Sequence, residues 1–414
     1  MTDMRTELLR LPRPHPRAAA LVCLMVAASG ARAQTDDAAP FYTGVSVGVT
    51  HVSNVYRVGG ATALPEGTTN SDNVTTAALL AGLNTRLGRQ RLSFDGSLQD
   101  NRYANNSTLN NSAYSLRGAL DWETVGDLSG TLSAQASRSL AQFNLGNGAE
   151  LVTQKNLERS REVNAVARLG ANLRYSLEAG LNHRSRDYSA EQYDRFVYSQ
   201  NTATLGAYAR PGGNVRLGLV ARRTEGEYPR YPIYISIFRV GSQTIDYRRN
   251  DVDLTANWTT GGSSQLFTRI STSRVHHDPV NGPLRDFHGT TGAVNWTWQP
   301  TGKINLGVQL VRDTGQETLL STTNVNRVGT SWQLNGVYAL TGKLSFNATA
   351  TGSRSERDDG GFDSERTQGI GLRWAYSRGL SLACQYNHAS RDSSVLQYVY
   401  TASSYGCTGQ ALFF

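Results

Sequence analysis

From about residue 41 to the C-terminus, apolar and polar residues alternate along short segments, as in residues 304–311 and 344–351. A period of two places successive side chains on opposite faces of a β-strand. Each segment therefore has one apolar face and one face of hydroxyl, amide, glycine or arginine residues. This pattern predicts an all-β fold, a transmembrane antiparallel β-barrel of the bacterial outer membrane, with lipid outside and water inside. A soluble β-sandwich also alternates, but it does not need so many long amphipathic strands that end in aromatic residues.

The composition agrees with a barrel rather than with a helical membrane protein. The chain has 414 residues and a mean hydropathy of −0.41. A helical membrane protein needs several apolar runs of roughly 20 residues, and the one apolar run here is short and N-terminal. Because the lumen face of a barrel is polar, low hydropathy is compatible with a membrane location.

The N-terminus has the three parts of a secretory signal. Four arginines between Arg5 and Arg17 precede the apolar stretch Ala18–Ala28, and Ala31–Ala33 reads A-x-A. The stretch is too short for a membrane anchor. We therefore expect residues 1–33 to be a cleavable signal peptide and residues 34–414 to form the barrel.

Breaks between the alternating segments predict the topology. Eight are short and nine are long, which indicates about 18 strands, or 16 if the weak segments 73–86 and 397–404 are misread. Outer-membrane barrels have short periplasmic turns and long external loops. The short breaks lie at 87–90, 123–127, 170–172, 211–214, 260–264, 300–303, 341–343 and 378–379. The long breaks lie at 57–72, 104–110, 140–155, 188–195, 225–246, 276–287, 315–325, 355–366 and 391–397.

One long break is unusually apolar for a loop. Within 225–246, the segment 231–240 either folds inward as a constriction or extends the flanking strands above the membrane. Tryptophans support the orientation, because five of the six lie just before short breaks, where a periplasmic aromatic girdle is expected. These five are Trp122, Trp258, Trp296, Trp298 and Trp374, whereas Trp332 lies nearer the other end of its segment.

Charged residues on the polar faces are the candidates for lining the lumen. A charge that faces lipid costs about 2–4 kcal/mol at mid-depth, so the lumen is its natural place. Any single charge is better explained by pairing across the barrel, but together they suit a hydrated, hydroxyl-rich or weakly anionic solute. The candidates are Arg91, Asp95, Arg117, Asp121, Arg168, Arg174, Arg216, Arg222, Asp251, Asp253, Arg269 and Arg373.

Two cysteines remain after signal removal. Cys384 and Cys407 lie on the last two expected strands, about equally far from the break between them. In an exported chain they permit one disulfide, and two free thiols are the alternative. The formal net charge of +8 is spread among strands and loops without a basic cluster, so we expect no nucleic-acid binding.

No catalytic, cofactor or metal site is predicted. The run His276–Asp278 stands in one loop without a second cluster of ligands. The remaining histidines are scattered, and the sequence contains no nucleophile-elbow, phosphate-loop or zinc-protease motif. We therefore expect a protein without enzymatic activity.

Several short motifs carry a family resemblance across nearly the whole mature chain. They are Ser53–Arg57, Gly88–Leu92, Arg102–Tyr103, Leu128–Gly130, and Arg391–Ser394 followed by Tyr398. The chain resembles the β-barrel porin group that contains the EpsL-like proteins of exopolysaccharide operons. The resemblance implies an outer-membrane barrel that works with a periplasmic polysaccharide export complex and takes a polysaccharide as cargo. It offers no catalytic residues.

Three functions follow as hypotheses. The first is a passive pore for export of a secreted exopolysaccharide. The second is a general or sugar-selective diffusion porin. The third is an outer-membrane scaffold or enzyme that acts on the polymer.

Overall fold

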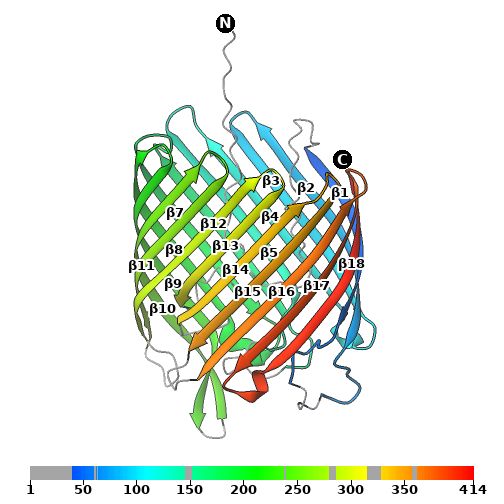
Figure 1. Ribbon diagram of the computed structural model, residues 1–414. Helices are drawn as coiled ribbons and strands as arrows, with labels where there is room; N and C mark the ends of the chain where they lie inside the picture. Colours follow the sequence, from blue (N-terminus) through cyan, green and yellow to red (C-terminus); the bar gives the residue numbers. More distant parts are fainter. Residues whose placement is uncertain are drawn as a thin grey trace.

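The chain folds into one closed β-barrel (Figure 1). The computed structural model describes residues 40–414 except 60–61, 63, 145–151, 237–238, 279–285, 315–327 and 357–360. Its 18 antiparallel strands follow each other around the sheet in chain order, and β1 closes the barrel by pairing with both β2 and β18. The predicted fold and strand number are confirmed, and the two weak segments are strands β2 and β18. The expected signal peptide lies outside the described residues.

The strands are long enough to cross a bilayer at a tilt. In chain order they are β1 Phe41–Val52, β2 Asp72–Leu87, β3 Gln90–Tyr103, β4 Asn111–Glu123, β5 Leu128–Leu140, β6 Leu157–Leu169, β7 Tyr175–Tyr188, β8 Tyr198–Gly212, β9 Val215–Ser236, β10 Arg239–Thr260, β11 Ser264–His277, β12 Phe287–Thr301, β13 Ile304–Thr314, β14 Val328–Ala339, β15 Leu344–Glu356, β16 Phe362–Ala375, β17 Leu380–Ser393 and β18 Tyr400–Phe413. Three short 3-10 helices lie between strands: η1 Ser107–Leu109, η2 Glu191–Phe196 and η3 Leu396–Tyr398. Among the described residues, no helix is long and apolar enough to cross a membrane.

The outer face of the wall is apolar. On β1, Val45, Val47 and Val49 are 44–58% exposed, while Gly44 and Gly48 between them are buried on the inner side. Leucines, valines and isoleucines repeat this exposure on strand after strand. A belt of apolar side chains on a closed sheet is the lipid-facing surface of a membrane barrel.

The end with short turns carries the aromatic girdle. Trp258, Trp296, Trp298 and Trp374 are 36–46% exposed there, and the indoles of Trp296 and Trp298 stack with centroids 5.5 Å apart. Glycines with positive φ, such as Gly88 at +62°, close the tight turns that an L-residue would strain. This end is therefore the periplasmic one, as predicted.

The hairpin formed by β9 and β10 corrects one prediction. The expected loop 225–246 is wrong, because both strands run through it as 22-residue strands that pair out to Ser236 and Arg239. The hairpin projects beyond the neighbouring strands in Figure 1. Of the two alternatives for segment 231–240, the strands are therefore extended. The reason is packing, since Tyr228, Tyr231 and Ile245 form one buried cluster with Tyr247 on the inner face of the hairpin.

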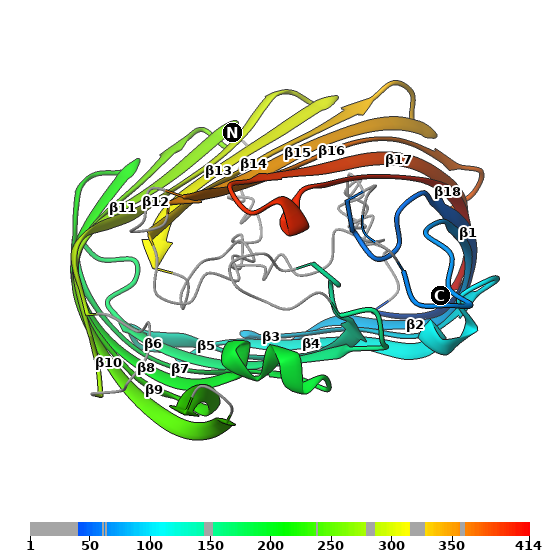
Figure 2. The ribbon, with the colours of Figure 1, turned by 90° about the horizontal axis from the view of Figure 1, so that it is seen from below.

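Two buried apolar clusters lie among the loops at the outer mouth. The first contains Tyr56, Val58, Leu109 and Phe143, which come from three different loops. The second joins η2 to the segment after β5 through Tyr193, whose ring is fully buried. Figure 2, which views the mouth along the barrel, shows the β1–β2 loop lying inside the ring of strands. The outer loops thus have cores of their own.

Candidate functional site in the lumen and its outer mouth

A network of arginines and aspartates lies on the lumen face of β9–β13. Its centre is Arg249, which is fully buried and donates from Nε to Asp251 Oδ2 at 2.8 Å and from Nη1 to Asp313 Oδ1 at 2.7 Å. Hydroxyl groups of Ser273, Thr291 and Thr314 accept further hydrogen bonds from it. Because charge-assisted bonds in a dry site are strong, Arg249 ties four strands together.

The same network extends toward the periplasm. Arg222 Nη2 lies 3.4 Å from Asp251 Oδ2 and 3.3 Å from Asp253 Oδ1, and Arg269 Nη2 lies 3.3 Å from Asp313 Oδ2. We call Arg222, Arg249, Asp251, Asp253, Arg269 and Asp313 the wall network. Three guanidinium groups meet three carboxylates, so the network is formally neutral.

A second set of ion pairs follows β6 and β7 along the lumen. From the outer to the periplasmic end, the pairs are Glu158–Arg186 at 3.2 Å, Glu162–Arg184 at 2.9 Å and Arg168–Glu178 at 3.0 Å. At the periplasmic end, Glu178 also accepts from Arg216 on β9, 3.4 Å away, and that guanidinium lies 3.6 Å from the centre of the Tyr208 ring. Two arginines share one carboxylate, so this part of the wall has an excess of positive charge.

A third network crosses the outer mouth, and we call it the mouth bridge. Its residues are Arg57 from the β1–β2 loop, Gln142 and Asn144 after β5, Glu365 on β16, Arg391 on β17 and Tyr400 on β18. Glu365 Oε1 accepts from Gln142 Nε2 and the Tyr400 hydroxyl, both at 3.0 Å, while Oε2 accepts from Arg391 Nη2 at 2.5 Å. Arg57 Nη1 lies 3.3 Å from Oε1.

Asn144 holds the other side of the mouth bridge. Its Nδ2 donates to the carbonyl of Arg57 at 2.8 Å and to the carbonyl of Tyr398 at 3.3 Å. Arg391 Nη1 donates to both the carbonyl and the side-chain oxygen of Asn144 at 3.1 Å. β5 and β17 are six strands apart around the barrel and lie on facing sides in Figure 2. The contacts therefore connect opposite walls.

A tyrosine of η2 supports the mouth bridge, and one residue of the bridge has a strained backbone. The Tyr193 hydroxyl of η2 donates to the carbonyls of Gln142 and Phe143 at 3.0 and 2.5 Å. Burial raises the pKa of this hydroxyl above its usual range, so it remains a donor. Arg57 has φ +53°, a left-handed conformation that a non-glycine residue adopts at a cost of about 1 kcal/mol. Surrounding contacts hold this conformation in place.

The predicted lumen residues on β3 and β4 lie on the inner face. Asp95 accepts from the Tyr42 hydroxyl at 3.3 Å, and Arg91 Nε donates to Asn84 at 3.1 Å. Arg117 and Asp121 face the same side, with Arg117 Nη2 3.5 Å from Gln135. Their register places arginine opposite aspartate at both positions.

Of the other residues predicted to line the lumen, most belong to the ion-pair networks and one does not line the wall. Arg168, Arg216, Arg222, Asp251, Asp253 and Arg269 belong to the networks above. Arg373 lies on the inner face of β16, opposite Ala383, and has no ion pair among the described residues. Arg174 departs from the prediction, because it is an exposed residue of the β6–β7 turn, next to Tyr175 at the periplasmic rim. It precedes the strand and cannot line the wall.

Sequence reasoning missed the centres of two networks. Arg249 and Asp313 obey the same alternation as their predicted neighbours, so counting inner-face positions on β10 and β13 would have found them. Arg57, Glu365 and Arg391 are different. Arg57 lies in a loop, and its partners are more than 300 residues away in the chain, so no local pattern indicates the contact.

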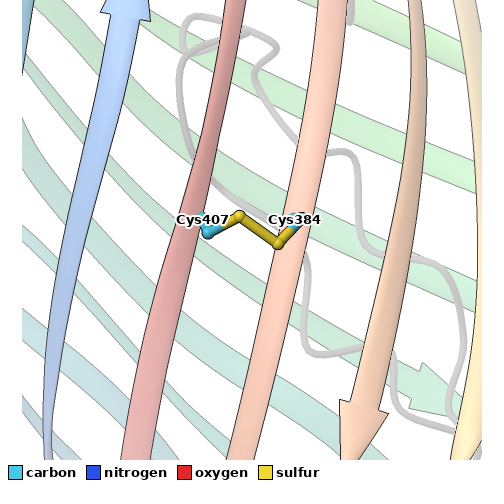
Figure 3. Close-up of a disulfide and its surroundings, with 2 residues drawn as sticks. All are labelled: Cys384 and Cys407. Carbon is cyan, nitrogen blue, oxygen red and sulfur yellow. A yellow bond between two sulfur atoms is a disulfide. The ribbon is translucent and has the colours of Figure 1, made fainter.

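Cys384 and Cys407 form a disulfide in the structure (Figure 3). They are directly opposite each other on β17 and β18. By alternation they share the outer face with the exposed residues Leu382 and Tyr405. The bond therefore staples neighbouring strands on the lipid side and takes no part in the lumen.

The described residues contain no group of three or more His, Cys, Asp or Glu residues placed to hold a metal ion. His276 and His277 both lie within ion-pair distance of the Asp286 carboxylate. They are consecutive on β11, so His276 is exposed on the outer face and His277 is buried on the inner face.

The chain matches no family model and no curated protein. Solved structures share its architecture at low identity. OccK2 (OpdF) of Pseudomonas aeruginosa, crystallised with glucuronate, is 12% identical, with a TM-score of 0.45 over 90% of this chain and 98% of that one. The outer membrane protein opdK of Pseudomonas aeruginosa is 13% identical, with a TM-score of 0.44 over 90% and 99%. OccAB3 of Acinetobacter baumannii is 8% identical, with a TM-score of 0.43 over 90% and 99%.

Proposed function

We propose that this protein is an outer-membrane diffusion channel for small hydrophilic solutes, with sugars and weak organic anions as the favoured class. A closed barrel with an apolar outer belt removes the lipid barrier. Its inner face offers guanidinium, carboxylate, amide and hydroxyl groups that replace the hydrogen bonds a solute loses from water.

The mouth bridge is the observation that carries the choice of a small solute. Gln142 and Asn144 from one side of the barrel bond to Glu365 and Arg391 on the other side. A solute must pass beside this connection. A diffusing sugar can do so in any orientation, whereas a polymer must thread past it continuously. The bridge therefore favours a diffusion porin over the export of a long polysaccharide.

Charge on the inner face supports the preference for anions. Glu178 and Glu365 each lie between two arginines, and Arg373 has no acidic partner among the described residues. Guanidinium groups bind carboxylates in a bidentate manner, which suits a weak organic anion.

Reconstitution tests this proposal. Proteoliposomes that contain the purified protein are mixed with a monosaccharide, a disaccharide, glucuronate and a dextran polymer, and swelling is recorded. We expect entry of the small solutes, fastest for glucuronate, and exclusion of dextran. No entry of any solute, while planar bilayers also show no conductance steps, would refute a channel.

Polysaccharide export is the second candidate, supported by the family resemblance and by the length of the polar inner wall. It requires that the mouth bridge open when the periplasmic export complex docks. A deletion strain that secretes normal amounts of polysaccharide would exclude it. The third candidate, an enzyme or scaffold for the polymer, requires that the purified protein cleave, acylate or retain the glycan.

A further inference from the structure

Arginines recur on the outer face of the barrel at the extracellular end of the apolar belt. On β13 the outward residues Leu306, Val308 and Leu310 are followed by Arg312, and on β16 the outward run from Trp374 to Ile370 ends, after Gln368, in Arg366. The same succession occurs on β3, β5, β6, β9, β10, β11 and β15, where the outward arginines are Arg102, Arg138, Arg161, Arg223, Arg248, Arg274 and Arg354.

The strand register places four of these arginines at similar depths. Arg312 and Arg354 lie on one row across the sheet, because both are paired with Thr330 of β14. The same row crosses β11 at Ile270, so Arg274 lies four residues farther toward the outside. Arg366 pairs with Gly352, two residues closer to the periplasm than Arg354.

A shift of six residues over the five strands from β11 to β16 is what a tilted barrel requires. With strands about 4.8 Å apart, a rise of about 3.3 Å per residue and a tilt of about 40°, constant depth needs about 1.2 residues per strand. The shift is uneven from strand to strand, and the same geometry leaves the four arginines within about 6 Å of one depth. Arg274, Arg312, Arg354 and Arg366 therefore form a band along the membrane surface, which we call the arginine patch.

Most of the patch has no acidic partner in the part of the chain that the structure describes. Arg274, Arg312 and Arg366 are exposed and have no carboxylate within ion-pair distance among the described residues, whereas Arg354 lies 3.4 Å from the exposed Glu356. By contrast, the three arginines of the wall network are all paired with carboxylates. Trp332 lies just below the patch, at the depth where tryptophan marks a membrane interface.

We propose that the arginine patch binds anionic, phosphate-bearing lipid headgroups of the outer leaflet. Arginine presents a fork of donors that matches phosphate oxygens, and basic residues at a membrane surface attract anionic headgroups. The acyl chains would lie on the apolar belt below the patch. A second copy of the chain is a poorer occupant, because a symmetric contact would bring arginine against arginine. The proposal rests on the barrel spanning a membrane and is independent of what the lumen conducts.

Native mass spectrometry of the full barrel tests the proposal. The protein in detergent micelles is titrated with phosphatidylglycerol or with phosphatidylcholine, and bound lipids are counted. We expect phosphatidylglycerol to bind about tenfold more tightly, and the R274Q/R312Q/R366Q variant to lose most of this preference. The variant R274K/R312K/R366K, which keeps the charge, should retain most of it.

A matched control removes the same charge elsewhere. R86Q/R89Q/R174Q changes three arginines at the periplasmic rim and should keep the wild-type preference. Equal affinity for the two lipids in the wild type, or the same loss in the control as in R274Q/R312Q/R366Q, would overturn the proposal. Channel conductance is read separately, so a barrel that binds phosphatidylglycerol but conducts nothing would refute only the proposed function.

Discussion

The wall network and the mouth bridge both consist of arginine–carboxylate pairs, but the pairs differ in burial and in the parts of the barrel that they connect. In the wall network, the side chains of Arg249, Asp251 and Asp313 are fully shielded from solvent and connect strands within one stretch of the sheet, from β10 to β13. In the mouth bridge, Glu365 is 23% exposed and its arginine partners are 20% and 7% exposed, and the contacts join opposite walls. The first network holds the wall together, and the second restricts the opening.

Burial sets the energetic difference between them. Removing one partner of a buried ion pair costs about 3–5 kcal/mol, because the other charge stays behind without compensation. A partly hydrated pair can exchange protein contacts for water, so it is cheaper to break. A barrel can therefore open its mouth while its wall stays intact, and four substitutions test this difference.

Replacing Arg249 with methionine should have the largest effect on stability. It leaves Asp251 and Asp313 buried without their central donor, so we expect the free energy of unfolding to fall by about 3–5 kcal/mol. Urea unfolding in lipid vesicles, followed by tryptophan fluorescence, measures it. Arg248→Met is the matched control, since this neighbour is 59% exposed on the outer face and should change stability by about 0.5 kcal/mol or less. Equal effects would mean that the wall network is not a stabilising element.

Replacing Glu365 with glutamine should affect conductance more than stability. The change leaves Arg57 and Arg391 to repel each other, so the mouth bridge should loosen and single-channel conductance should rise. The free energy of unfolding should fall by about 1–3 kcal/mol, less than for Arg249→Met. Glu356→Gln removes an exposed charge on the outer face and serves as control. Unchanged conductance would show that the bridge does not limit flow.

Asn144→Ala should act in the same direction with a smaller amplitude. It removes two donated hydrogen bonds and one side-chain acceptor from the bridge while leaving every charge in place. We expect a loss of about 1–2 kcal/mol and a partial rise in conductance. Gln154→Ala changes an exposed amide of the same loop and should leave the conductance as it is. A rise larger than that of Glu365→Gln would assign the closing role to the asparagine.

Tyr193→Phe should have the smallest effect. Losing the hydroxyl removes its support for the carbonyls of Gln142 and Phe143, which should cost about 1 kcal/mol. Because burial raises the pKa of Tyr193 in the folded state, the unfolded chain ionises first. The tyrosine's contribution should therefore be constant below about pH 10 and decline above it. Unfolding at several pH values measures this, and a gap that widens with rising pH would contradict it.

The sequence predictions were correct where a feature depends on residues close together in the chain, and they failed where it depends on tertiary packing. Alternation placed Asp251 and Arg269 on the inner face, because facing is a local property of a strand. It also indicated Cys384 opposite Cys407, since both positions are counted from one turn. It failed at 225–246, where polar residues suggested a loop and the packing of Tyr228 with Ile245 extends two strands instead.

The sequence alone indicated the barrel, its orientation and the polarity of each face, because all of these depend on a period of two and on turns of a few residues. It predicted about 18 strands with 16 as the alternative, and the structure has 18. Only the tertiary structure decided that the mouth is crossed and that outward arginines lie at similar depths. The bridge depends on contacts between Arg57 and Glu365, which are 308 residues apart. The band depends on register accumulated over six strands. No single segment of the sequence indicates that Arg57 meets Glu365 or at what depth an outward arginine lies in the membrane.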